Sequence, residues 1–278
     1  MPTVRGILQK WVYIPIWLYT VFAVGPFVWI VLLSLRNTSE IWNNPYGLPI
    51  PAHFEKFVEV FTKFSYATYF QNSIIVSVSA VALGTLAGSM AAFVLSRQRY
   101  RFKFREPIYL LLFVSIMFPP QITLIALFQN MVQLHLYNTL EGLILVYAAS
   151  ELPISIYLLR AFFIQIPQDI EDAARVDGCG DWRMFWQVML PIARPAIAAV
   201  VILDFISDWN EFLYAVVFIS KQPLRTLPLA VTFFLGENFQ DIGMLATGMM
   251  VTILPVVIIY VFFSEALIKG MTAGAVKG

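Results

Sequence analysis

The chain has 278 residues, of which 59% are hydrophobic and only 13% are charged, whereas soluble domains average about 45–50% apolar and about 25% charged residues. This composition, with a mean hydropathy of +0.76, excludes a soluble enzyme, a disordered protein and a nucleic-acid-binding protein. One cysteine excludes a disulfide scaffold, two histidines argue against a zinc site, and a net charge of +1 selects no partner.

Six apolar segments are each long enough to cross about 30 Å of hydrocarbon as a helix. Because helices satisfy their own backbone groups in lipid, we predict an all-α, polytopic membrane helix bundle that forms one domain over 1–278. The first segment is too long for a signal-peptide core and no small-residue cleavage site follows it, so we expect it to remain as a span. The predicted transmembrane helices are 12–33, 72–95, 108–131, 142–162, 192–214 and 243–263.

The basic residues predict the orientation of these spans. With the N-terminus inside, thirteen of the 18 Lys and Arg residues fall in cytoplasmic segments and five fall outside, which favours N-in and C-in. The short basic run from Arg97 to Arg105 is the strongest single indication. Segment 35–69 is then external, and it is either an irregular surface loop or a docking surface for an external partner.

Spans 2 and 3 contain two sequence features that affect packing. Gly84-x-x-x-Gly88 permits a close helix approach, and we favour a structural packing role for it. Phe118-Pro119-Pro120-Gln121 breaks the third span near its centre, either as a static kink or as a local gate.

Span 4 contains Glu151 near its middle, two residues before Pro153. Acids inside a membrane are costly and are functional candidates by default. A proline kink frees carbonyl groups beside the acid, which together could meet a hydroxyl-rich solute on a translocation pathway. The alternative is an acid paired with a neighbouring helix.

The cytoplasmic segment after span 4 predicts a short helix with defined ends. Asp169 can cap its N-terminus, with Asp172 three residues later in an arrangement like a capping box. Glu171 and Asp172 suit the dipole of the first turn. Gly178 is placed to end the helix in a left-handed conformation, which gives about two and a half turns.

One face of this short helix is small. Ile170, Ala173, Ala174 and Asp177 share it by their three- and four-residue spacing, and a second amphipathic stretch follows over 182–190. Two alanines allow another surface to approach the backbone closely. The helix is therefore either a peg for a soluble partner or a connector that packs on its own bundle.

At these residues the chain resembles the permeases of binding-protein-dependent ABC importers. Their cytoplasmic signature is Glu-Ala-Ala, three residues, Gly, nine residues, and Ile-x-Leu-Pro. It stands here as Asp172-Ala173-Ala174, Gly178 and Val188-Met189-Leu190-Pro191, with Asp172 in place of Glu and Val188 in place of Ile. Three further blocks resemble the carbohydrate-uptake branch of this family: Trp209-Asn210-Glu211-Phe212, Thr226-Leu227-Pro228 and Leu254-Pro255. The C-terminal residues 274–278 resemble the end of the smaller permease of maltose-type systems.

The resemblance implies a type I ABC importer permease fold, with its core over 70–264 and a coupling loop over 167–191. It implies a bacterial inner-membrane protein that is not itself an enzyme and needs no cofactor, since ATP and Mg would be bound by partners. Those partners are a second permease in a heterodimer, two ATPase subunits and an external solute-binding protein. The residues implied in ATPase coupling are Glu171, Asp172, Ala173, Ala174, Asp177, Gly178, Pro191, Lys277 and Gly278.

Span 5 contains a stripe of acids. Asp204, Asp208 and Glu211 follow one another at i, i+4 and i+7, which predicts one helical face, and Asn210 flanks it. Because a polar stripe toward lipid is costly, we expect it to face the translocation channel or the partner permease.

These sequence features bear on three alternative functions. A carbohydrate importer permease accounts for the cytoplasmic signature and for the missing Gly-x-x-x-x-Gly-Lys-Ser/Thr phosphate loop. An ion-coupled secondary transporter would use Glu151 and Asp204 as ion sites, but it leaves the signature unexplained. A membrane enzyme would need a motif such as His-Glu-x-x-His or Gly-x-Ser-x-Gly, and the sequence has neither.

Overall fold

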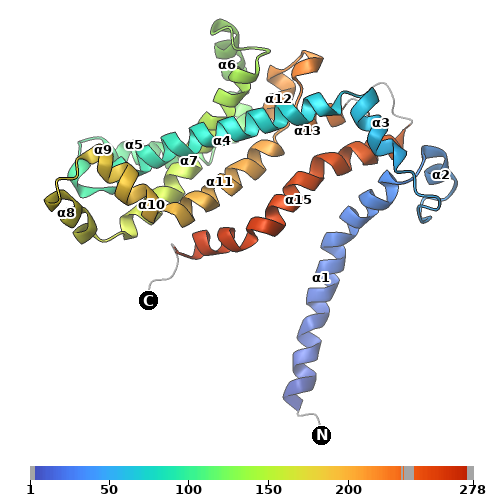
Figure 1. Cartoon of the computed structure of the whole chain (residues 1–278), viewed down its shortest axis with the longest axis horizontal. Coiled ribbons are helices and arrows are strands. Elements are labelled where there is room, and N and C mark those ends of the chain that lie inside the picture. Colours follow the sequence, from blue (N-terminus) through green and yellow to red (C-terminus); the bar gives the residue numbers. More distant parts are fainter. Residues whose placement is uncertain (1–3, 233, 235–240, 274–278) are drawn as a thin grey trace. The chain divides into compact units, whose positions relative to one another are not determined.

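The computed structural model describes residues 4–232, 234 and 241–273, and within them all regular secondary structure is helical. Figure 1 shows the elements in chain order. They are α1 (Val4–Ser34), α2 (Thr38–Asn43), α3 (Glu55–Lys63), α4 (Tyr66–Ser96), η1 (Gln98–Tyr100), α5 (Arg105–Ser115), α6 (Pro120–Gln133), α7 (Leu140–Gln165), α8 (Gln168–Val176), α9 (Asp181–Arg183), η2 (Met184–Met189), α10 (Leu190–Ile192), α11 (Arg194–Trp209), α12 (Leu213–Phe218), η3 (Gln222–Leu224), α13 (Leu227–Val231) and α15 (Ile242–Ala273).

Within the described residues, four helices are long and apolar enough to cross a membrane: α1, α4, α7 and α15. They contain the predicted spans 12–33, 72–95, 142–162 and 243–263. Two bent helix pairs would bring the number of spans to six if each pair is one span. The all-α prediction is confirmed, while the number of spans and their direction stay predictions.

The third predicted span, 108–131, is two helices rather than one kinked helix. α5 ends at Ser115, α6 begins at Pro120, and the two axes differ by 105°. Pro119 is extended, with ψ at 139°, and Pro120 occupies the first turn of α6, where its missing N–H costs nothing. Two consecutive prolines thus start a new helix where we expected a kink.

The fifth predicted span, 192–214, is also interrupted. The helical segment over 181–192 meets α11 at a 78° bend. α11 ends at Trp209, and α12 begins four residues later. The expectation of one continuous helical face from Asp204 to Glu211 is therefore wrong, because Glu211 lies beyond the end of α11.

The described residues form two compact units, the first within 1–67 and 230–255 and the second within 68–229 and 256–278. In the first unit, side-chain hydrogen bonds join the end of α1 and the start of α2 to the start of α15. The Thr247 hydroxyl donates to the Ser34 carbonyl at 3.0 Å. The Thr38 hydroxyl donates to Asp241 Oδ1 at 2.7 Å and accepts from the Gly243 N–H at 3.1 Å.

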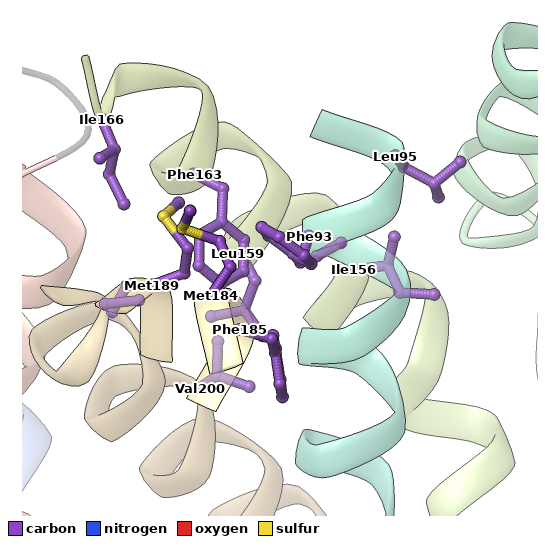
Figure 2. Packing of buried hydrophobic residues seen from close by; sticks show 13 residues of the cluster. Phe93, Leu95, Ile156, Leu159, Phe163, Ile166, Met184, Phe185, Met189 and Val200 are labelled. Atoms are coloured by element: carbon purple, nitrogen blue, oxygen red, sulfur yellow. The ribbon is translucent and has the colours of Figure 1, made fainter. Parts of the chain in front are cut away.

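In the second unit, α7 packs against α5, α11 and α12 and contributes to two apolar clusters. One cluster joins its first half to α4, α6 and α12 and includes Leu143 and Phe218. Figure 2 shows the other, in which Phe93 of α4 lies beside Phe163 of α7 and Met184 of η2. Phe163 and Met184 are fully buried, so the segment that follows α8 is anchored to α4 and α7.

Glycines bring α4 close to α7, as the Gly84-x-x-x-Gly88 spacing predicts. A Cβ at Gly84 would lie 3.2 Å from the Ala148 carbonyl oxygen, and one at Gly88 would lie 3.1 Å from Ser155 Cβ. Backbone atoms of α7 cannot move away as a flexible side chain would, so this contact requires glycine in α4.

We expect Gly84→Leu to separate α4 from α7 and to destabilise the protein by about 1–3 kcal/mol, the usual cost of overpacking. The measurement is the thermal unfolding midpoint of the purified protein in mild detergent. Gly25→Leu in α1 is the matched control, since a Cβ there meets nothing within 4 Å. Equal midpoints for the two variants would contradict this account of the packing.

Candidate functional site

The short helix α8 forms where the sequence predicts it, but its N-terminus is built differently. The N-cap is Pro167, in an extended conformation with ψ at 141°, and no side chain caps the helix. The predicted capping by Asp169 with Asp172 is therefore wrong, because the helix begins one residue before Asp169. Asp169 and Glu171 instead lie in the first turn, where their charges suit the helix dipole.

The C-terminus of α8 follows the prediction. Gly178 has a φ of +80°, a left-handed conformation that glycine adopts without steric cost. Its N–H donates to the Arg175 carbonyl at 2.9 Å, and the Cys179 N–H donates to the Ala174 carbonyl at 3.0 Å. These two bonds form a Schellman motif, which fixes the helix end and the direction of the following chain.

The side chains of α8 divide between an exposed and a buried face. Asp172, Ala173 and Asp177 are exposed, and Val176 is 88% exposed. Ala174, predicted to share the face of Ala173, is half-buried and packs against the apolar cluster of Figure 2. The accessible face of α8 is thus small and apolar, with a carboxylate on either side.

Glu171, which we expected on the partner-facing side, is turned into the protein and is fully buried. Its Oε1 forms an ion pair with Arg97 Nε at 2.5 Å. Arg97 follows the last residue of α4 and is 4% exposed. Burial lowers the pKa of Arg97 and the Glu171 charge opposes that shift. Glu171 therefore acts within the chain and is inaccessible to a docking partner in this conformation.

Arg97 makes two further contacts that the sequence analysis missed. Its Nη1 donates to the Ile166 carbonyl at 3.0 Å, and its Nη2 lies 3.5 Å from Met189 Sδ. In the sequence, Arg97 stands only as part of a basic run that indicates membrane orientation. The sequence signal that could have identified it is an arginine directly after a span, in a chain whose coupling loop carries an extra acid at Glu171.

A second charged cluster lies beyond the C-terminus of α8. Arg175 Nη2 pairs with Asp181 Oδ1 at 2.9 Å, and Arg99 Nε is 3.7 Å from the same oxygen. Hydrogen bonds from Arg175 and then Tyr100 hold the pKa of Asp181 below its usual value. Residues just after α4 therefore reach both ends of α8.

Of the remaining predicted coupling residues, Pro191 is in the described part of the chain. Pro191 is half-buried in α10, at the end of the segment that bends into α11. Lys277 and Gly278 lie outside the described residues.

The acids of span 5 are not on an open surface. Asp204 and Asp208 are 2% and 4% exposed, on a helix that packs against α7. Asp204 Oδ2 accepts a hydrogen bond from the Ser155 hydroxyl at 2.8 Å. Glu151, half-buried in α7, is hydrogen-bonded to Ser207 and Asp204. Asp204 and Asp208 are thus covered by the chain's own residues in this conformation, whereas Asn210 is exposed; that the stripe faces a channel or a second permease stays a prediction.

Glu211 and Asn210 cap the break between α11 and α12. Glu211 accepts hydrogen bonds from the Tyr147 hydroxyl at 2.7 Å and from the Tyr214 N–H at 2.7 Å. The Ala215 N–H also donates to it, at 3.1 Å. The Asn210 side chain donates to the Ile206 carbonyl at 2.7 Å. These side chains satisfy backbone groups that the interrupted helix leaves open.

Pro153 lines a cavity of about 730 Å³ in the angle between α5 and α6. Hydroxyl groups from Ser115, Thr123, Ser150 and Tyr214 are among its lining residues. Of the residues predicted for the pathway, Pro153 is the one in the wall of this cavity, whose lining is otherwise mostly apolar.

Segment 35–69, predicted to be external, is not an irregular loop throughout, since it contains α2 and α3. The buried Arg36 side chain donates to the Glu40 and Asn44 carbonyls at 2.6 and 2.7 Å. Tyr46 and Ile50, in the same segment, are more than 80% exposed. The role of this segment as a docking surface stays a prediction.

His53 lies between two carboxylates in this segment. Its Nε2 is 2.8 Å from Glu40 Oε1, and its Nδ1 is 2.8 Å from Glu55 Oε1. Only the doubly protonated ring can donate to both. The hydrogen bond to Glu40, followed by that to Glu55, raises the pKa of His53 above 6.5.

Comparison with known proteins assigns the family. Residues 84–272 match the model of the binding-protein-dependent transport system inner membrane component. This match covers more than half of the chain, so the chain belongs to that family.

Relatives and a solved structure agree with this assignment. The diacetylchitobiose uptake system permease protein NgcG of Streptomyces coelicolor is 36% identical over 262 residues, which are 94% of this chain and 86% of that protein. The arabinooligosaccharides transport system permease protein AraQ of Halalkalibacterium halodurans is 34% identical over 273 residues, 94% and 96% of the two chains. A chain in the crystal structure of a bacterial ABC transporter involved in the import of the acidic polysaccharide alginate has a TM-score of 0.81 at 22% identity, over 95% of this chain and 98% of that one. This last likeness establishes the ABC importer permease fold.

The His53 cluster predicts a defined pH dependence. Because the pKa of His53 is raised, the protonated ring stabilises the folded segment fully below pH 6.5. This stabilisation is lost as the pH rises through the raised pKa. The hydrogen bond from His53 lowers the pKa of Glu40 below 4.5, so its contribution is lost as the pH falls through the lowered value. The thermal midpoint of the wild type should therefore exceed that of His53→Asn most between pH 4.5 and 6.5. A difference that grows above that range would contradict the sign.

The cap at Glu211 predicts a coupled pair of substitutions. Glu211→Ala should destabilise the protein by about 1–2 kcal/mol through loss of the α12 cap, and Tyr147→Phe by about 1 kcal/mol. Because both remove the same hydrogen bond, the double variant should lose less than the sum of the two. Unfolding midpoints in detergent measure this, and strictly additive losses would show that the two groups do not interact.

Proposed function

We propose that this chain is a transmembrane permease subunit of an ATP-driven, binding-protein-dependent ABC importer for a carbohydrate. The observation that carries the proposal is α8, a capped nine-residue helix that presents a small, exposed face and carries the Asp172-Ala173-Ala174 and Gly178 signature. Membership of the binding-protein-dependent family and the sugar-transport names of its relatives support it.

The chain would form half of the translocation pathway in the bacterial inner membrane, paired with a second, different permease. Two ATPase subunits would bind and hydrolyse ATP with Mg. An external solute-binding protein would deliver the solute to the outer side, where the exposed side chains of segment 35–69 offer it a surface.

Coupling would proceed through the accessible face of α8. Asp172, Ala173 and Asp177 would contact a cleft on the ATPase, since the small side chain of Ala173 beside the carboxylates allows a close approach. Closure of the ATPase dimer on ATP would then displace α8, and the segment that follows it would transmit this displacement to α11. Pro191, Lys277 and Gly278 would contribute to the same interface.

The solute would meet hydroxyl and aromatic groups rather than free charges. The cavity lined by α5, α6, α7 and α12 offers Tyr214, Phe118 and hydroxyl groups within a mostly apolar wall that includes Pro153. Glu151, Asp204, Asp208, Asn210 and Glu211 would shape the path indirectly in this conformation, because they hold α7, α11 and α12 together.

The test is uptake by the full assembly in liposomes that carry ATP inside. Gly178→Asp should abolish uptake and leave membrane insertion intact, because Asp adds bulk and a charge to the exposed turn beside the docking face. Gly180→Asp is the matched control. Gly180 has an ordinary φ of −75° at the N-cap of α9, where Asp is favoured, so uptake should stay within about twofold of wild type. ATP-independent uptake driven by a proton or sodium gradient would overturn the proposal in favour of an ion-coupled transporter.

A further inference from the structure

The residues just after α4 enclose both ends of α8. Arg97 pairs with Glu171 in the first turn of α8. Arg99 and Tyr100 interact with Asp181, which also pairs with Arg175 in the last turn. The chain enters α8 through Pro167 and leaves it through Asp177 and the left-handed Gly178.

A helix of nine residues cannot fix its own orientation. Isolated helices of this length are marginal in water, and packing or side-chain contacts must hold them in place. On α8 the fully buried side chain is Glu171, and Ala174 and Arg175 are half-buried. Ala174 offers a single methyl group, and Arg175 pairs with the exposed Asp181, so the buried charge contact of α8 is the ion pair of Glu171.

Arg97 joins three segments through one planar group. Its guanidinium contacts Glu171 within α8, the Ile166 carbonyl before α8, and Met189 Sδ in η2 after α8. The Arg97 carbonyl in turn accepts a hydrogen bond from Arg105 Nη1 at 3.0 Å, at the start of α5. A guanidinium has donors in a fixed fork, whereas a lysine ammonium has one flexible centre.

We propose that Arg97 is the positioning residue of the coupling helix: its buried pair with Glu171 makes α8 move as one body with the end of α4. The inference rests on the proposed function, since it assigns how a displacement of α8 reaches the membrane helices. Without this link α8 still presents its docking face and binds the ATPase, but its motion is no longer transmitted to α4.

The experiment compares Arg97→Ala, Glu171→Gln and the exchanged pair Arg97→Glu with Glu171→Arg. Arg99→Ala is the matched control, because Arg99 is the neighbouring arginine, is 57% exposed, and lies 3.7 Å from Asp181. Two quantities are measured on each complete assembly in liposomes: the solute taken up per ATP hydrolysed, and the amount of ATPase that co-purifies with the chain.

Arg97→Ala and Glu171→Gln should each lower the uptake per ATP at least about tenfold while the ATPase still co-purifies. The exchanged pair should recover part of that loss, because it restores opposite charges at the same two positions. Arg99→Ala should stay within about twofold of wild type. Unchanged coupling in Arg97→Ala, or a loss in Arg99→Ala as large as that in Arg97→Ala, would overturn the proposal.

A measurement that needs no transport keeps the proposal testable if a variant assembles poorly. In a Cys179→Ser background, spin labels at Val176→Cys in α8 and Leu145→Cys in α7 occupy exposed positions in the same unit. The distance distribution should be narrow in this background and should broaden when Arg97→Ala is added. A distribution that stays narrow with Arg97→Ala would overturn the proposal.

The two proposals fail in different ways. If the wild-type assembly takes up no solute with ATP, the proposed function fails, whatever the distance distributions show. If the wild type transports and Arg97→Ala transports with equal coupling, the function stands and the positioning role is wrong.

Discussion

The buried ion pair between Arg97 and Glu171 is the interaction on which the α8 end of the second unit depends. Moving two charges out of water is costly, and their attraction offsets this only when geometry is good and the remaining donors are satisfied. Here Arg97 Nε and Glu171 Oε1 interact as opposite charges without the alignment of a hydrogen bond, and the other two guanidinium nitrogens have a carbonyl and a sulfur as partners. Loss of either partner would leave an unpaired buried charge, a change that usually costs about 3–5 kcal/mol. The arrangement therefore fixes one orientation of α8, since any rotation of the helix exposes or isolates a charge.

The same requirement for satisfied polar groups explains where the other side chains of the second unit lie. A helix that breaks at membrane depth leaves N–H and C=O groups that lipid cannot bind. Glu211 and Asn210 supply partners at the break between α11 and α12. After α6, Asn138 Oδ1 accepts from the Ser220 and Lys221 N–H groups at 2.7 and 2.9 Å. Glu211, Asn210 and Asn138 thus bind the chain's own backbone at these breaks.

The sequence predicted those features that depend on local chemistry. The length of the apolar segments predicted the four long helices. The paired prolines predicted the position of the α5–α6 break, and Gly178 predicted the left-handed end of α8. It failed where the outcome depends on contacts between distant segments. Periodicity assigned Asp204, Asp208 and Glu211 to one face because it assumes an unbroken helix, and it cannot detect a break that a side-chain cap stabilises. The burial of Glu171 depends on Arg97, which lies more than 70 positions away, so spacing within α8 gave no sign of it.

Glu171 and Asp172 of α8 differ in how strongly the structure of this chain constrains them. This difference is consistent with the one acid at which the chain departs from the family signature, Asp172 in place of Glu. Asp172 stands where the signature has Glu, and its side chain is exposed. Among the described residues, no buried contact fixes the length of its stem, so either acid fits the fold of this chain at that position. Glu171 has no such freedom, because its carboxylate must reach Arg97 Nε across the packed interior. A stem shorter by one methylene would separate the two charges. The exposed position can therefore vary with the partner it meets, while the buried position is constrained by the chain itself.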